Sequence, residues 1–313
     1  MTVAASACLT GAEVRYDGSG AKSSYPHDRL KGLLQIHPVC PEVGVGMPTP
    51  RPPIRLVGDS QSPRVVSVHD PELDHTAELS EFGRHQAKLL RDVGVSGYVF
   101  MKNSPSCGLF RVKVYPNGAQ MPVRAGRGIY ADAVARAWPE LPLEECGRLQ
   151  DAILRENFVM RVFAYAHWQA LVAEGITAGR LVAYHSRYKY LLMAHSVPAY
   201  KATGRLLADL KTDLEPLAQR YIEMLMQGLS RPASRGGHAN VLSHLQGYFK
   251  DHLNATAKRD LADLIDGYRR GEQPLLAVLA VLRHHLSQHP DEYVAYQVYL
   301  EPTPASAGLR VAL

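Results

Sequence analysis

The chain has 313 residues, of which 46% are hydrophobic and 21% are charged, proportions that are ordinary for a soluble globular protein. A chain of this length exceeds one typical hydrophobic core, so two domains are expected. The net charge of +5 permits a polyanionic partner but does not require one. Four cysteines in this length exclude a disulfide-stapled scaffold.

The first residues, MTVAASACLTG, lack the basic and apolar stretches of a signal peptide. No apolar run approaches the roughly 18 residues that a membrane span needs. We therefore expect a cytoplasmic protein with no membrane contact, and the sequence leaves its oligomeric state open. In a reducing cytoplasm, widely spaced thiols are metal ligands or catalysts more often than disulfide partners.

Up to about residue 142, strands alternate with helices. Hydrophobic periodicity predicts strands at 3–7, 34–39, 64–68 and 97–101, and helices at 26–33, 73–93 and 129–137. Residues 41–53 contain five prolines and are predicted to form a stiff loop. Alternating strands and helices pair in parallel with right-handed crossovers. Residues 1–142 are therefore predicted to form an α/β domain with a mostly parallel sheet.

From residue 143 onward the strand signal ends, and residues 143–313 are predicted to form an all-α domain. Helices are predicted at 144–174, 177–195, 199–210, 213–226, 238–252, 256–271 and 274–287. Thr177 is the expected N-cap of the second of these helices. Pro274 suits the first position of the last one.

Three of the four cysteines, Cys8, Cys40 and Cys107, follow predicted strands. Ligands of open parallel α/β sheets bind beyond the carboxyl ends of the strands, so these three thiols could meet at one point. Any one of them could also be an inert buried residue. Because no CxxC pair is present, the spacing does not separate an iron–sulfur site from a zinc site. Cys146 lies at an apparent helix start beyond the first domain and is expected to be a bystander.

Five segments around these cysteines together resemble the thiouracil desulfurase family: SACLTG (6–11), VRYDG (14–18), PVCPE (38–42), PRPPIRL (50–56) and SPSCG (104–108). The remainder resembles the YbgA-type helical domain, through RENF (155–158), HWQ (167–169), HSRYKY (185–190), NVLSH (240–244) and GYFK (247–250). Proteins that fuse the two domains resemble tRNA 4-thiouridine desulfidases. The resemblance therefore implies an enzyme that binds tRNA and returns its 4-thiouridine to uridine.

The resemblance also implies a 4Fe–4S cluster held by Cys8, Cys40 and Cys107, with one iron left open. An open iron can act as a Lewis acid toward the soft sulfur of a thiocarbonyl. The implied reaction is hydrolytic C–S cleavage, in which water replaces sulfur at the ring carbon and sulfide leaves. Glu42, two residues from a ligand, is the expected general acid/base. Ser104 is its expected hydrogen-bond partner or proton relay.

Asp17, Arg15 and Ser106 are candidate substrate-binding residues. Structural roles remain open beside these functional ones. Asp17 and Arg15 could pair with each other, Ser104 could stabilise the bend at the following proline, and Glu42 could cap a helix or loop.

Two basic clusters in the second domain are candidate RNA contacts. His185, Arg187 and Lys189 share one predicted helix with several tyrosines, and aromatic and basic side chains together suit base stacking and phosphate contact. Arg231 and Arg235 precede another helix, whose first amides suit a phosphate. Each cluster could instead be a solvated basic face.

Three functions remain open from the sequence. The first is the iron–sulfur desulfidase acting on 4-thiouridine in tRNA. The second is desulfuration of free 2-thiouracil or a similar small thiolated base, with the helical domain as a lid or an oligomer interface. The third is a non-catalytic redox or metal sensor that binds nucleic acid, which would have no need of Glu42 and Ser104.

Overall fold

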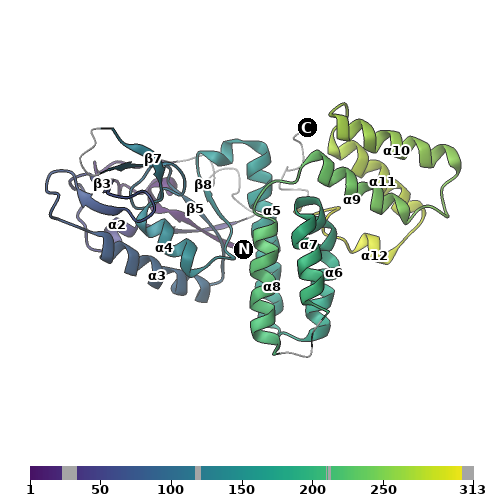
Figure 1. The fold of residues 1–313 in the computed structure, drawn as a ribbon, viewed down its shortest axis with the longest axis horizontal. Coiled ribbons are helices and arrows are strands. Elements are labelled where there is room, and N and C mark those ends of the chain that lie inside the picture. The colour runs from purple at the N-terminus through teal and green to yellow at the C-terminus, as the bar shows by residue number, and fades with distance from the viewer. Residues whose placement is uncertain (23–33, 117–120, 209, 211–212, 305–313) are drawn as a thin grey trace. The chain divides into compact units, whose positions relative to one another are not determined.

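The computed structural model describes residues 1–22, 34–116, 121–208, 210 and 213–304. The chain forms two compact units, Met1–Asp151 and Ala152–Leu313. The predicted fold class is confirmed, since an α/β part with a parallel sheet is followed by a helical part (Figure 1). The helix predicted at 26–33 lies outside the described residues.

The first sheet has the strand order β2-β1-β5-β8, and every pair in it is parallel. Its strands are β1 (Thr2–Ser6), β2 (Gln35–Val39), β5 (Val95–Phe100) and β8 (Leu143–Glu145). All of β5 is buried, as expected for a strand covered on both faces. The strand β8 was not predicted, because Leu-Glu-Glu carries no apolar run. The helix predicted from residue 144 in fact begins at residue 152.

A second sheet of mixed pairing has the order β4-β3-β6-β7. It contains β3 (Ile54–Val57), β4 (Arg64–Ser67), β6 (Val112–Tyr115) and β7 (Val123–Gly126). The strand predicted at 64–68 is β4 of this second sheet, where it pairs antiparallel with β3. Leu56, Val65 and Val112 of this sheet form a buried cluster with Leu79 and Ile129 of the helices.

In its described residues, the first unit contains the short helices η1 (Ala7–Thr10), α2 (Pro41–Gly44) and η2 (Arg148–Gln150) and the longer helices α3 (Thr76–Asp92) and α4 (Ile129–Ala137). The longer pair, α3 and α4, pack against each other (Figure 1). The stretch predicted as a stiff loop opens with α2, whose first position is Pro41. Proline suits that position because its missing N–H has no partner there.

The described part of the second unit is helical. Its helices are α5 (Ala152–Ala173), α6 (Ala178–His195), α7 (Val197–Leu206), α8 (Leu214–Gly228), α9 (Arg235–Gly247), α10 (Ala255–Arg270), α11 (Leu275–Gln288) and α12 (Glu292–Ala295). Thr177 caps α6 as predicted, with its hydroxyl accepting from the Arg180 amide over 3.2 Å. Pro274 is the N-cap of α11, one position earlier than predicted. Within the described residues, none of the helices is long and apolar enough to cross a membrane.

Candidate functional site

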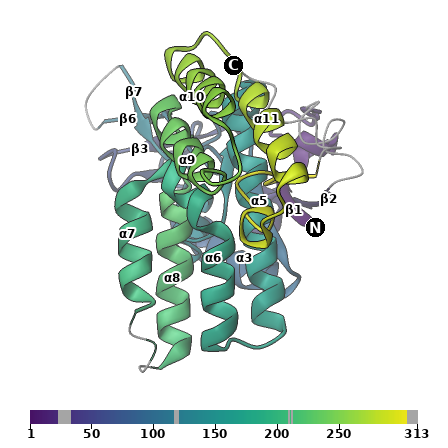
Figure 2. The same cartoon turned by 90° about the vertical axis from the view of Figure 1, so that its right-hand side faces the viewer.

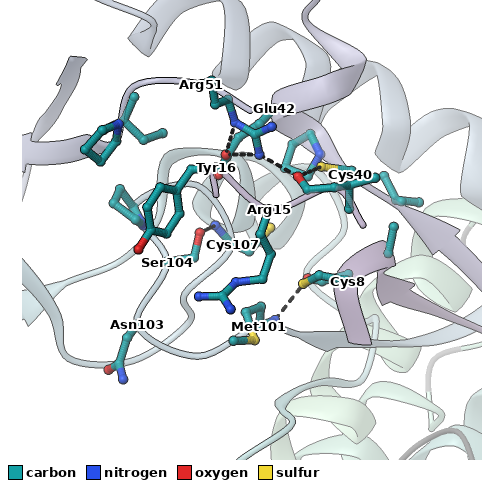
Figure 3. A pocket seen from close by; sticks show the side chains of 18 of the residues that line it. Cys8, Arg15, Tyr16, Cys40, Glu42, Arg51, Met101, Asn103, Ser104 and Cys107 are labelled. Atoms are coloured by element: carbon teal, nitrogen blue, oxygen red, sulfur yellow. Dashed lines mark hydrogen bonds and ion pairs between the residues drawn. The ribbon is translucent and has the colours of Figure 1, made fainter. Parts of the chain in front are cut away.

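All four strands of the parallel sheet lead into a cysteine at the same edge. Cys8 lies in η1 after β1, Cys40 is the N-cap of α2 after β2, and Cys107 lies in the loop after β5. Cys8, Cys40 and Cys107 line one cavity of about 440 Å³ (Figure 3). Cys146 follows β8 directly and lies within the first unit. The prediction that it lies at a helix start beyond the first domain was wrong. It is buried and is not among the residues that line the cavity.

The donor chemistry of this cavity fits an iron–sulfur cluster. Within the described ranges, no three His, Cys, Asp or Glu side chains are arranged to hold a single metal ion. Cys8, Cys40 and Cys107 nevertheless line the same cavity, so thiols are the soft donors that it offers. Thiolates are the protein ligands that iron–sulfur clusters use.

Burial controls the acidity of these thiols. It raises the pKa of Cys8 to about 11, and the neighbouring Cys40 adds to the rise. Burial also raises the pKa of Cys40 and of Cys107. A metal centre that binds these thiols must therefore displace their protons, which makes its binding dependent on pH.

The loop that carries Cys107 is held against the start of α4. The amides of Ile129 and Ala131 donate to the carbonyls of Pro105 and Ser106 over 3.0 and 3.1 Å. Gly128 makes this contact possible, because a Cβ there would lie 2.5 Å from the carbonyl of Ser106. The carbonyl groups of the loop thus accept hydrogen bonds from amides of the first turn of α4, which have no acceptor within the helix.

Glu42 is fixed from two sides. Its Oε2 accepts from the guanidinium of Arg51, with Nε at 2.7 Å and Nη2 at 2.5 Å (Figure 3). Its Oε1 accepts from Ser106 Oγ at 2.5 Å. Arg51 is only 8% exposed and donates further to the carbonyls of Pro48 and Val14. No role was predicted for Arg51 from the sequence. The available signal was an arginine between two prolines in a rigid segment.

The serine hydroxyls form a directed chain. The single hydroxyl proton of Ser106 is donated to Glu42, so Ser104 must donate across the 2.9 Å contact between the two serines. Ser104 Oγ in turn accepts from the amides of Ser106 and Cys107. Ser104 and Glu42 line the cavity, whereas Ser106 is fully buried behind them. Proton donation therefore runs from Ser104 through Ser106 to Glu42.

Arg15 and Asp17 take different positions. Arg15 lines the cavity, and its Nη1 donates to Ser19 Oγ over 3.1 Å. Asp17 accepts from the amide and hydroxyl of Ser19, and these hydrogen bonds lower the pKa of its carboxyl. Arg15 Nη1 also lies 4.0 Å from Asp17 Oδ2. The contacts of Asp17 thus lie within its own turn. Tyr16 and Asn103 also line the cavity and were not predicted.

The first basic cluster of the helical unit is largely engaged within the fold. His185 Nδ1 lies 3.2 Å from the hydroxyl of Tyr221, and burial lowers the pKa of His185 to about 4. Lys189 Nζ lies over two tyrosine rings, at 5.0 and 4.8 Å from their centres. The guanidinium of Arg187 lies 5.1 Å from the ring centre of Tyr296. Such cation–π contacts tie these cations to neighbouring aromatic side chains.

The second basic cluster lies at the start of α9. Ser234 caps this helix by accepting from the Gly237 amide over 3.0 Å. Arg235 Nη1 donates to the carbonyl of Tyr268 over 3.2 Å. Arg231 is exposed, and both arginines line hollows of the surface.

Comparison with known proteins assigns a class to each part of the chain. Residues 3–146 match the family model described as 2-thiouracil desulfurase, and residues 189–304 match the model described as a protein of unknown function, DUF1722. The thiol-lined cavity thus lies within a desulfurase domain, which makes the chain an enzyme of carbon–sulfur bond cleavage.

Among individual proteins, the uncharacterized protein YbgA of Escherichia coli (strain K12) is 41% identical over 157 residues, which cover 50% of this chain and 93% of YbgA. The uncharacterized protein YbbK of Bacillus subtilis (strain 168) is 29% identical over 112 residues, or 33% of this chain and 70% of YbbK. The chain belongs to the family of YbgA and joins its DUF1722 region to a 2-thiouracil desulfurase domain, which confirms the predicted resemblance.

A solved structure described as the [4Fe-4S]-dependent thiouracil desulfidase TudS aligns with a TM-score of 0.39 and 29% identity. The alignment covers 48% of this chain and 93% of that one.

Proposed function

We propose that the protein is an iron–sulfur-dependent desulfidase that converts 4-thiouridine in tRNA to uridine and releases sulfide. One observation carries the proposal: three thiols from separate strands line one cavity with a carboxylate that is itself held in place. The match of this unit to a 2-thiouracil desulfurase model supports it. We also propose that the protein is cytoplasmic.

In this proposal Cys8, Cys40 and Cys107 hold a 4Fe–4S cluster. Three cysteines leave one iron without a protein ligand, and such an iron supplies a Lewis acid soft enough for a thiocarbonyl sulfur. Cys146 is the one other cysteine of the chain, and it does not line the cavity.

The residues of the cavity handle the protons. Water adds to the ring carbon that carries sulfur, and Glu42, at the cavity wall, takes a proton from that water. Arg51 and Ser106 fix the direction of the carboxylate, and Ser104 is the cavity end of the proton chain that leads to it. A C–O bond forms, the C–S bond breaks, and sulfur leaves as hydrogen sulfide. The two protons come from water, and no electrons are exchanged.

Features at the cavity wall and in the second unit support a polynucleotide substrate. Arg15 and Lys102 line the cavity, together with Tyr16, which is 45% exposed. Cations suit phosphate, and an exposed aromatic ring suits stacking with a base. The second unit adds exposed cations that line hollows of its surface.

Free 2-thiouracil is the second candidate substrate, favoured by the description of the family that matches residues 3–146. One anaerobic experiment separates the two. The cluster is reconstituted, tRNA containing 4-thiouridine is added, and the loss of its near-ultraviolet absorbance is followed, with 2-thiouracil in parallel. We expect turnover of the tRNA. Turnover of the free base alone would contradict the tRNA assignment.

A further inference from the structure

We propose that a groove of the helical unit, centred on His195, binds the phosphodiester backbone of RNA. This inference rests on the proposed function, because it names the surface by which the tRNA substrate is held. Three hollows make up the groove, and His195 lines all of them. Two of the hollows are lined by residues from the end of α6, the starts of α7 and α9 and the end of α8, segments that lie side by side in Figure 2. The other hollow is lined in addition by residues of α5, α10 and α11.

The three hollows have His195 as a common lining residue. The first, of about 610 Å³, is lined by residues of α7, of the end of α8 and of the segment after α8, including Arg231. The second, of about 680 Å³, runs from Lys201 on α7 to His244 on α9. The third, of about 160 Å³, reaches Arg235. Three neighbouring hollows with cationic lining residues suit the repeated phosphates of a polynucleotide.

The charge of the groove is one-sided. Lys201, Arg231 and Arg235 line it, with Glu156 as the single acidic lining residue among those described. Lys201 and Arg231 are exposed, and neither makes an ion pair or a side-chain hydrogen bond with any residue that the structure describes. Unneutralised cations along an open groove attract a polyanion.

Other cations of the same unit are paired with acidic or aromatic side chains. Arg269 and Arg270 at the end of α10 pair with Asp266, and Arg270 pairs further with Glu272. In the first basic cluster, Arg187 and Lys189 lie over tyrosine rings. Lys201 and Arg231 therefore remain available to a partner in a way that these four cations do not.

The groove is built into the packing of the helices. A Cβ at Gly237 would lie 2.0 Å from the carbonyl oxygen of Ala194, so the start of α9 can reach the end of α6 only with glycine there. At the end of α8, a Cβ on Gly228 would lie 2.6 Å from Leu192 and 2.7 Å from Ala199. Close backbone packing fixes the floor of the groove, and small or apolar side chains such as Ala202 form its wall.

The test measures binding of 4-thiouridine tRNA to the full chain by fluorescence anisotropy over a range of salt concentrations. The double variant K201A/R231A should bind at least about tenfold more weakly at low salt. The slope of log affinity against log salt should fall by about 1 for each cation removed. Turnover of free 2-thiouracil should stay at the wild-type value, because neither residue lines the thiol cavity.

Two further variants make the test specific. K258A/R259A removes two exposed cations of α10 that do not line the groove, and it should bind like wild type. Ala202→Phe narrows the groove without changing the charge, and it should weaken binding. Circular dichroism and thermal melting check that each variant is folded.

The outcomes separate this inference from the proposed function. If the wild-type chain binds no tRNA, the tRNA substrate itself is contradicted. If the wild-type chain binds tRNA and both K201A/R231A and Ala202→Phe bind equally well, the groove is overturned and the desulfidase proposal stands. Equal weakening by K201A/R231A and K258A/R259A would also overturn it, because net charge alone would then explain the binding.

Discussion

Ser106 Oγ lies 2.5 Å from the Glu42 carboxylate, although 64 residues separate the two in the chain. Glu42 follows β2, and Ser106 follows β5, so the contact exists only because the two strands end at the same edge of one sheet. Ser106 carries no contact with the cavity itself. It acts on the reaction by setting the position of Glu42, which makes it a positioning residue.

Replacing Ser106 with alanine should therefore lower turnover by about tenfold or more, since a misplaced acid/base group loses much of its contribution. Iron content and visible absorbance should stay unchanged, because the thiols are untouched. Ser67→Ala, which also removes a buried serine hydroxyl, is the matched control and should retain activity. Full activity of Ser106→Ala would show that the proton chain plays no part.

Arg51 should be needed for stability as well as for activity. Its guanidinium is the buried partner of Glu42, and removing one partner of a buried ion pair costs about 3 kcal/mol or more. Arg51→Ala should thus lower the melting temperature and turnover together. Arg51→Lys should recover only part of both, because an ammonium cannot match the bidentate contact. A wild-type melting temperature in Arg51→Ala would contradict this account.

Glu42→Gln and Ser104→Ala test whether the protein is a catalyst or a sensor. Each should reduce turnover by about a hundredfold, the contribution typical of a general acid/base. Both should keep the iron content and the tRNA affinity of the wild-type chain. A sensor would instead show no turnover in the wild-type chain, and then these substitutions would change nothing that can be measured.

The helical unit should lose stability in mild acid because of His185. Burial holds the pKa of His185 at about 4 in the folded chain, against about 6.5 in an unfolded one. Between these pH values, His185 is protonated in the unfolded chain but not in the folded chain. The free energy of unfolding is therefore unaffected by His185 above pH 6.5 and falls as the pH drops toward 4. His185→Gln should flatten the decline in melting temperature between these values. His252→Gln, at an exposed histidine, should not.

Much of the fold was predictable because its signals are local. Apolar runs marked β1, β2 and β5, and each preceded a cysteine, so the edge of the sheet could be named from the sequence. Strand β8 could not be predicted, since two of its three residues are acidic and its place in the sheet depends on pairing with β5. The ion pair of Glu42 and Arg51 was equally hidden, because it depends on how a proline-rich segment turns back on α2. The inward position of Ser106 likewise depends on Gly128, far along the chain.

The four cysteines provide the most direct test of the metal centre. Cys8→Ser, Cys40→Ser and Cys107→Ser should each lose most of the iron and the visible absorbance after anaerobic reconstitution, because a hydroxyl is a poor ligand for a soft iron–sulfur centre. Cys146→Ser should keep both, since its side chain does not line the cavity even though it follows the fourth strand of the same sheet. This variant controls for the loss of a buried thiol as such. Loss of iron in Cys146→Ser, with iron retained in any one of the other three, would show that the ligand set has been assigned to the wrong strands.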